Sequence, residues 1–145
     1  MAMLLMDTFP KDKEGSALLR KVKLAIANIC GHGVSRKGVV LTAPKKLKPG
    51  RDNLKADYKE IWKKCTIEFD ENETGASVIM KTYRIRLGPF FLRPMIKVTD
   101  MEEVILHEFL HVALDIKDRQ FHHGFMTQIL KYNMGYKEDS AIFVD

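Results

Sequence analysis

The sequence has few of the features that stabilise small secreted proteins or anchor a chain in a membrane. It contains two cysteines, Cys30 and Cys65, which lie 35 positions apart and form no C-x-x-C pair. Two such cysteines make no disulfide framework, so reduced thiols are expected. No apolar run approaches the roughly 20 residues that span a bilayer. The apolar residues 1–6 are too short for a signal peptide. These absences exclude secretion and membrane insertion, and predict a cytoplasmic protein.

Length and charge limit the architecture further. A chain of 145 residues predicts one domain, covering residues 1–145. Its net charge of +5 is uneven, because residues 1–64 carry 15 Lys and Arg against 6 Asp and Glu, whereas residues 65–145 carry 9 against 13. A basic half is typical of proteins that contact nucleic acid, which makes DNA a candidate partner. The simpler interpretation is a solvated, lysine-rich surface.

The order of the expected elements predicts an α+β fold. Helices are expected at 16–30, capped by Ser16, and at 53–63, with a short strand at 39–41 and a basic loop at 45–51 between them. A strand at 66–69, a polar turn at 70–75 and an extended segment at 76–87 follow. Apolar positions change phase within that segment, so a bulge or tight turn is expected near residues 81–82. An apolar loop at 90–92 leads to a helix capped by Thr99 or Asp100 that ends near Ile116, and a last helix is expected at 123–133.

The helix that begins near Asp100 contains an H-E-x-x-H motif, formed by His107, Glu108 and His111. Four residues turn a helix through about 400° and advance it by about 6 Å, so both imidazoles emerge on one face. Two neutral imidazole nitrogens at that spacing can bind one tetrahedral Zn²⁺, and Glu108 can take a proton from a water on the metal. The flanking residues are apolar almost all round, which predicts a buried helix. Buried polar groups are energetically costly unless a partner satisfies them, and a bound metal would do so. The alternative is a hydrogen-bonded pair of core histidines.

The third metal ligand must come from outside the motif. Position 117, where some metallopeptidases and metal-dependent endoribonucleases carry a third histidine six residues after the second, holds Lys117. Cys65 lacks the Gly-Cys-Leu turn of deformylases. His123, at the start of the predicted helix 123–133, can fold back over the metal and is the favoured ligand. The alternatives left open are His122 and the acidic residues Asp115, Asp118 and Glu138.

These residues resemble the SprT-like (Spartan-like) zinc metallopeptidase domain, or a closely related phage-type or minimal zincin. In that family a strand of the form Arg-Ile-Arg-Leu precedes H-E-x-x-H, and a His-Gly motif follows. Here residues 83–87 read Tyr-Arg-Ile-Arg-Leu, and His123-Gly124 lies downstream. The small residues 74–76 resemble the turn that opens the preceding strand in the family. The pattern departs from the family at Thr127, where an aromatic residue is usual. The resemblance covers roughly residues 58–135.

The resemblance implies a minimal zincin-like fold, with a small, twisted, mostly antiparallel sheet packed on the H-E-x-x-H helix and flanking helices. Residues 65–145 would form the catalytic unit, and residues 1–64 a basic helical support. The strand at 83–87 is then the edge where a protein or peptide substrate would pair. The family acts on DNA-associated proteins.

We therefore expect a zinc metalloendopeptidase, in which His107, His111 and His123 hold Zn²⁺ and Glu108 is the general base. Tyr132, Tyr136, Arg84 and Arg86 are candidates to assist at the oxyanion, but packing tyrosines and surface arginines are the favoured interpretation. The alternative is a nucleic-acid-binding module with a structural zinc and no proteolysis.

Overall fold

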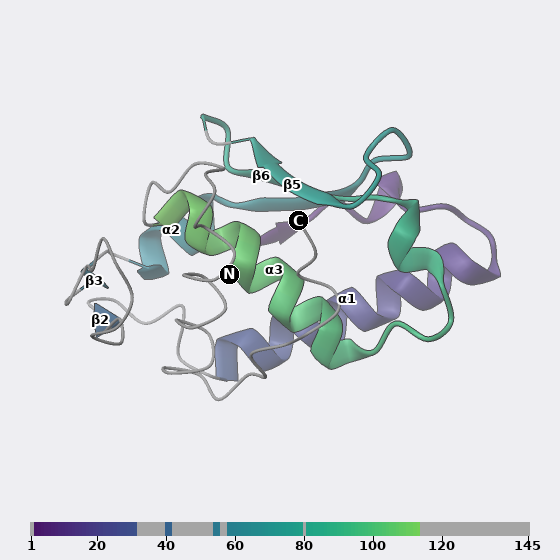
Figure 1. The fold of residues 1–145 in the computed structure, drawn as a ribbon, viewed down its shortest axis with the longest axis horizontal. Helices are drawn as coiled ribbons and strands as arrows, with labels where there is room; N and C mark the ends of the chain where they lie inside the picture. Colours follow the sequence, from purple (N-terminus) through teal and green to yellow (C-terminus); the bar gives the residue numbers. More distant parts are fainter. Residues whose placement is uncertain (1, 32–39, 42–53, 56–57, 80, 114–145) are drawn as a thin grey trace.

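The computed structural model describes residues 2–31, 40–41, 54–55, 58–79 and 81–113, which form an α+β arrangement (Figure 1). This confirms the general fold class. The helices are α1 (Lys13–Gly31), α2 (Tyr58–Lys64) and α3 (Val98–Ala113), with short 3-10 turns at Met6–Thr8 and Pro89–Leu92. The strands are β1 (Met3–Leu4), β2 (Val40–Leu41), β3 (Leu54–Lys55), β4 (Thr66–Phe69), β5 (Ala76–Ile79) and β6 (Arg84–Leu87).

The main sheet is mixed, with the strand order β1-β4-β6-β5. β1 and β6 both run parallel to β4, and only β5 is antiparallel to its neighbour β6. A mostly antiparallel sheet was therefore the wrong expectation. After β4 the chain forms β5, which is not a direct neighbour of β4 in the sheet. It then returns through a hairpin, and β6 lies between β4 and β5. β6 is consequently an interior strand and not the expected edge; the edges of this four-stranded sheet are β1 and β5.

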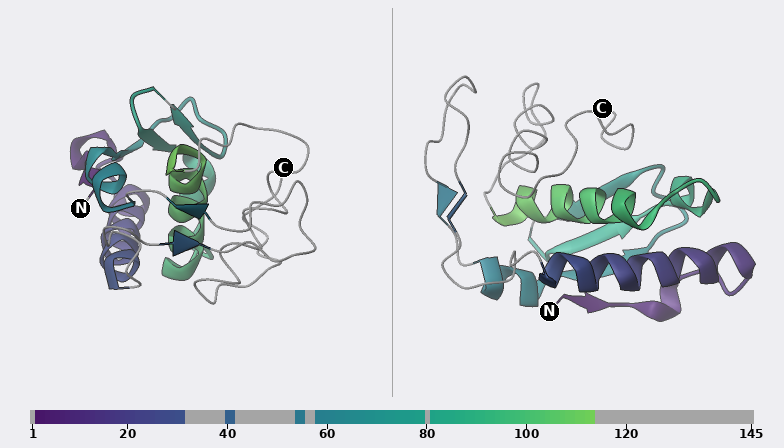
Figure 2. Two further views of the ribbon diagram at one scale, coloured as in Figure 1. Left: turned by 90° about the vertical axis from the view of Figure 1, so that its left-hand side faces the viewer. Right: turned by 90° about the horizontal axis from the view of Figure 1, so that it is seen from below.

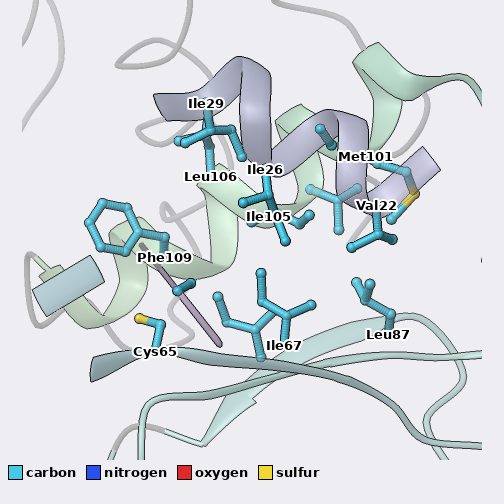
Figure 3. Close-up of a cluster of buried hydrophobic side chains, with 14 of the residues drawn as sticks. Val22, Ile26, Ile29, Cys65, Ile67, Leu87, Met101, Ile105, Leu106 and Phe109 are labelled. Carbon is cyan, nitrogen blue, oxygen red and sulfur yellow. The ribbon is translucent and has the colours of Figure 1, made fainter. Parts of the chain in front are cut away.

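Two helices cover one face of this sheet. α1 and α3 lie side by side and run in the same direction, as Figure 2 shows from below. Their apolar side chains meet those of the sheet in one core cluster (Figure 3). Met101 and Leu87 lie at one end of this core, whereas Phe109 and Cys65 lie at the other. Since this cluster includes residues from Ala2 to Leu110, both halves of the sequence build one core.

Local chemistry explains where α1 begins. The carboxylate of Asp12 accepts a hydrogen bond from the Gly15 amide at 2.8 Å, which places Asp12 at the N-cap. The expected cap, Ser16, lies inside the helix, so that prediction was wrong by one turn. The helix expected at 53–63 is also shorter, since Leu54 belongs to β3, which pairs with β2 in a separate two-stranded sheet.

The phase change between residues 76 and 87 is a tight hairpin turn, as expected. Residues 81–83 form a turn between β5 and β6, and the Thr82 amide donates to the Ile79 carbonyl at 3.2 Å. Tyr83 closes the turn with a φ of 54°, a left-handed conformation that is uncommon for an aromatic residue. The turn lets Val78 and Ile85 face each other as cross-strand partners although their parities differ.

Several expectations fall outside the described residues. These are the basic loop 45–51, the end of the motif helix near Ile116 and the helix at 123–133. Within the ranges that the structure does describe, no helix is both long enough and apolar enough to cross a membrane.

Candidate metal centre

The candidate centre is built on α3, whose first turn is fixed by its own polar residues. The Lys97 amide donates to a carboxylate oxygen of Asp100 at 2.8 Å. This is one half of a capping box, in which an acidic side chain in the first turn satisfies the amide of the residue before the helix. Asp100 therefore lies inside α3, which begins at Val98, and neither Thr99 nor Asp100 is the N-cap residue.

Every residue of α3 from Met101 to Val112 is buried, as the sequence predicts. The helix therefore exposes no face to solvent at these positions. Its buried polar residues, which need partners, are the ones that indicate a functional site. Glu102 faces α1, where the Asn28 amide group donates to its carboxylate at 3.2 Å. His111 follows Glu102 by nine residues, or about 2.5 turns, so it lies on the opposite side of α3. The two histidines thus point away from α1.

The structure brings the two histidines of the motif together. Their Nε2 atoms lie 3.3 Å apart, and their ring centroids lie 4.9 Å apart with an interplanar angle of 78°. The exposed fraction of each residue is 4%. With Glu108 they form a group whose candidate ligand atoms all lie within 4.8 Å of one another. Three chemically suitable residues therefore converge on one point.

The Nε2 separation matches what a shared metal requires. Two nitrogens held 2.0–2.1 Å from one tetrahedral Zn²⁺ lie roughly 3.3–3.4 Å apart. Hydrogen bonds between two ring nitrogens also reach this length, so the separation is compatible both with a shared ion and with a hydrogen-bonded pair of core histidines. Two imidazole nitrogens are donors that suit a zinc-like ion.

The side chain of Glu108 leaves α3 on a different side from the two histidines. It follows Met101, a fully buried residue of the core, by seven residues, or about two turns, so it shares that side of α3. On that side α3 packs chiefly against β5 and less against β6. Glu108 is itself buried, with an exposed fraction of 7%, and its carboxylate lies close to the two imidazoles.

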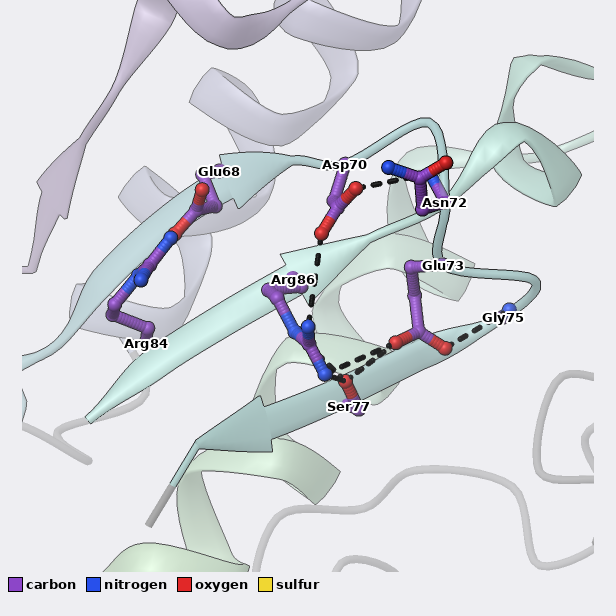
Figure 4. A network of polar contacts seen from close by, with 8 residues as sticks. All are labelled: Glu68, Asp70, Asn72, Glu73, Gly75, Ser77, Arg84 and Arg86. Carbon is purple, nitrogen blue, oxygen red and sulfur yellow. Dashed lines mark hydrogen bonds and ion pairs between the residues drawn. The ribbon is translucent and has the colours of Figure 1, made fainter. Parts of the chain in front are cut away.

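The arginines considered as oxyanion donors do not belong to the centre. Arg84 and Arg86 alternate with the buried Ile85 and Leu87, so they lie on the face of the sheet that α1 and α3 do not cover (Figure 4). Arg84 donates to Glu68 at 2.6 Å, and this carboxylate raises the pKa of the guanidinium.

Arg86 belongs to a network around the turn after β4. It lies 3.7 Å from Asp70 and 3.4 Å from Glu73, and it donates to the Ser77 hydroxyl (Figure 4). Neither arginine is therefore placed to assist at the oxyanion, because both guanidinium groups are paired on the opposite face. The favoured interpretation of both as surface arginines holds.

The other expected site residues lie outside the described ranges. They are the favoured third ligand His123, the alternatives His122, Asp115, Asp118 and Glu138, and the tyrosines Tyr132 and Tyr136. The chain that follows α3 therefore contains every third-ligand candidate from the sequence.

Two further residues of the described chain have structural roles. Cys65 is fully buried, and burial raises the pKa of its thiol to about 12, so it stays protonated and donates to the Ile61 carbonyl. Phe91, in the apolar loop 90–92, is buried in the core beside α1.

Glu103 is a further buried acidic residue of α3. Its exposed fraction is 6%, and it lies one turn before His107.

Comparisons with known proteins add no family assignment. No family model matches the chain, and neither a curated protein nor a solved structure is significantly similar to it. The conclusions below therefore depend on the residues and the geometry of this chain.

Proposed function

We propose that this chain is a zinc-dependent metalloendopeptidase of the minimal zincin type. The observation that carries the proposal is the 3.3 Å separation of the His107 and His111 Nε2 atoms, with the Glu108 carboxylate beside them. His123 completes the proposed ligand set, and the SprT-like pattern of the sequence supports the same assignment.

The proposed chemistry assigns a role to each residue of the motif. His107 and His111 would each donate an imidazole lone pair to Zn²⁺, which supplies Lewis acidity to a water and to a scissile carbonyl. Glu108 takes one proton from the attacking water and returns it to the amine that leaves. The burial of all three residues strengthens these electrostatic interactions, because water competes less in a dry site.

The revised sheet order changes where a substrate would lie. Since β6 is interior, the edge strand near the motif is β5, which packs against α3. We propose that an extended protein or peptide substrate adds to β5 and presents its scissile carbonyl near Glu108. Main-chain hydrogen bonds would supply affinity, and alternate side chains would supply specificity.

The direct test compares wild-type protein with Glu108→Gln. The variant is expected to bind about one zinc per chain, as the wild type does, and to lose cleavage of an unfolded protein substrate. Metal content and cleavage are measured on the same samples. His111→Ala is the matched comparison, because it removes a ligand and should lose both metal and cleavage.

Three outcomes would contradict the proposal. Wild-type protein that takes up no zinc excludes the site, and unchanged cleavage by Glu108→Gln excludes the mechanism. Zinc uptake without cleavage of any unfolded substrate, together with salt-dependent DNA binding, would favour the alternative of a nucleic-acid-binding module with a structural zinc.

DNA remains a proposed partner, through the basic residues of 1–64. Electrostatic binding to DNA weakens steeply as salt rises, because neutralised phosphates release counterions. Neutralising Lys45, Lys46 and Lys48 together should therefore weaken binding and flatten its salt dependence. DNA affinity that is independent of salt, or unaffected by these substitutions, would exclude this partner.

A further inference from the structure

We propose that β5 selects extended substrate segments in which apolar and polar side chains alternate, with Val78 as the residue that contacts an apolar position. This inference rests on the proposed function, because β5 is the strand to which a substrate would add. Val78 lies outside the H-E-x-x-H motif, so the preference and the metal chemistry can be tested separately.

The backbone of β5 shows which of its groups face a substrate. The hydrogen bond from the Gly88 amide to the Gly75 carbonyl fixes which residues of β5 bond to β6. In an antiparallel pair such residues alternate with residues whose amide and carbonyl point away from the partner. Counting from Gly75, the amides and carbonyls of Ala76 and Val78 therefore point to the outer edge. Among the strands of the described ranges, none pairs with this edge, because β5 is last in the sheet order.

The side chains of Ala76 and Val78 lie on the face of the sheet that the helices cover. Their partners on β6 are Leu87 and Ile85, which are fully buried in the core, and directly opposite residues share a face. Ala76 and Val78 pack against that core but are themselves only partly buried. A strand added beside β5 would therefore meet apolar surface on this face.

Ser77, between these two residues, lies on the opposite face of the sheet (Figure 4). Its hydroxyl donates to Glu73 at 2.7 Å and accepts from Arg86 at 2.9 Å. An apolar side chain laid over these groups would exclude water from a carboxylate and a guanidinium, which is costly. The face beside Ser77 therefore favours a polar side chain.

The pleat of a sheet converts these two surfaces into a preference for a sequence pattern. Directly neighbouring residues of two strands point to the same face, and successive residues point to opposite faces. The substrate residue beside Val78 would thus point to the helix-covered face, and the residue beside Ser77 to the other face. This alternation holds whether the substrate runs parallel or antiparallel to β5. The expected segment has apolar side chains at every second position and polar ones between them.

Val78 is the edge residue nearer to the candidate centre. Figure 3 shows Leu87 and Met101 at one end of the core and Phe109 at the other. Ala76 pairs with Leu87, so it lies toward the end of α3 that contains Met101. Val78 lies two residues further along β5, toward Phe109 and the motif. The apolar position beside Val78 should therefore affect cleavage most.

The test maps cleavage sites in unfolded proteins by mass spectrometry. Wild type should show apolar residues enriched, relative to their frequency in the same proteins, at two positions that flank one intervening residue. Val78→Thr replaces a methyl group by a hydroxyl and should weaken the enrichment at one of these positions roughly 3- to 5-fold, the loss expected for one buried methyl group. Ile79→Thr is the matched control, because Ile79 is the adjacent β-branched residue on the opposite face. It should leave the enrichment unchanged.

Three results would overturn the inference. They are a wild-type pattern without the two-residue period, an enrichment that Val78→Thr leaves unchanged, and an equal change in Val78→Thr and Ile79→Thr. If Val78→Thr fails to fold, the wild-type pattern still decides. Wild-type protein that cleaves nothing, or cleavage that Glu108→Gln retains, would instead refute the proposed function.

Discussion

Gly88 lies where β6 ends, against the turn that precedes β5. Its amide donates to the Gly75 carbonyl at 2.8 Å, and a Cβ at position 88 would clash with the Glu73 backbone carbonyl. A Cβ at Gly75, by contrast, meets no atom within 4 Å. The two glycines are therefore hydrogen-bonded to each other, but only position 88 is packed so closely that it must be glycine.

We predict that Gly88→Ala lowers the free energy of unfolding by about 2–3 kcal/mol, because backbone must move to admit the methyl group. Gly75→Ala should change it by less than about 0.5 kcal/mol. Urea unfolding of the two variants measures the difference. Equal effects at both positions would mean that the turn relaxes freely around Gly88.

Cys65 gives a prediction about alkaline pH. Burial raises the pKa of its thiol from 9.0 to about 12, so the folded state keeps a proton that the unfolded state loses. The stability due to this group is complete below pH 9 and declines as the pH rises toward 12, by about 1.4 kcal/mol per pH unit. Cys65→Ala should remove that slope in urea unfolding at pH 8 to 10.5. A slope that persists in the variant would assign it to other groups.

The sequence predicted only the part of the candidate centre whose residues are close together in the chain. His107, Glu108 and His111 lie within one helical turn, so their spacing in the sequence fixes their spacing in space. The exclusion of Arg84 and Arg86 needed the sheet, because a strand pattern does not say which face the helices cover.

At the scale of elements, the start of α1 decides between two candidate N-cap residues, Asp12 and Ser16. Ser16 and Asp12 are both good N-cap residues, but only the Asp12 carboxylate accepts from an amide of the first turn. We predict that Asp12→Ala costs about 1 kcal/mol of stability, whereas Ser16→Ala costs almost nothing. Thermal unfolding of the pair measures this. A larger loss from Ser16→Ala would contradict the assigned cap.

The strands show why element positions were easier to predict than their pairing. The period-2 pattern gave β4 with its observed bounds, and the phase change correctly placed the turn between β5 and β6. Neither pattern says which strands are neighbours, because pairing joins residues that are distant in sequence. The insertion of β6 between β4 and β5, which makes β5 the edge, was therefore not available from the sequence.

At the scale of the whole molecule, the proposed metal would bind α3, a helix whose apolar residues belong to the core that both halves of the sequence build. A ligand that binds only the native state raises its stability, by about 2.7 kcal/mol when the free ligand is at 100 times its Kd. We predict that zinc raises the melting temperature and that EDTA reverses the increase. Glu108→Gln should respond as wild type does, and His111→Ala should not. An identical response of His111→Ala would mean that zinc binds elsewhere.

The contact between α2 and α3 has a consequence for experiments on this protein. Trp62 is the only tryptophan in the sequence, is fully buried, and packs edge-on against Phe109 with ring centroids 5.2 Å apart. Its fluorescence therefore reports on the core next to Phe109, which is adjacent to Glu108 in the sequence. Cobalt or copper in the centre would quench this fluorescence through nearby absorption, whereas zinc would not. Trp62 would thus serve as an intrinsic optical probe of metal binding at the proposed centre, with no added label.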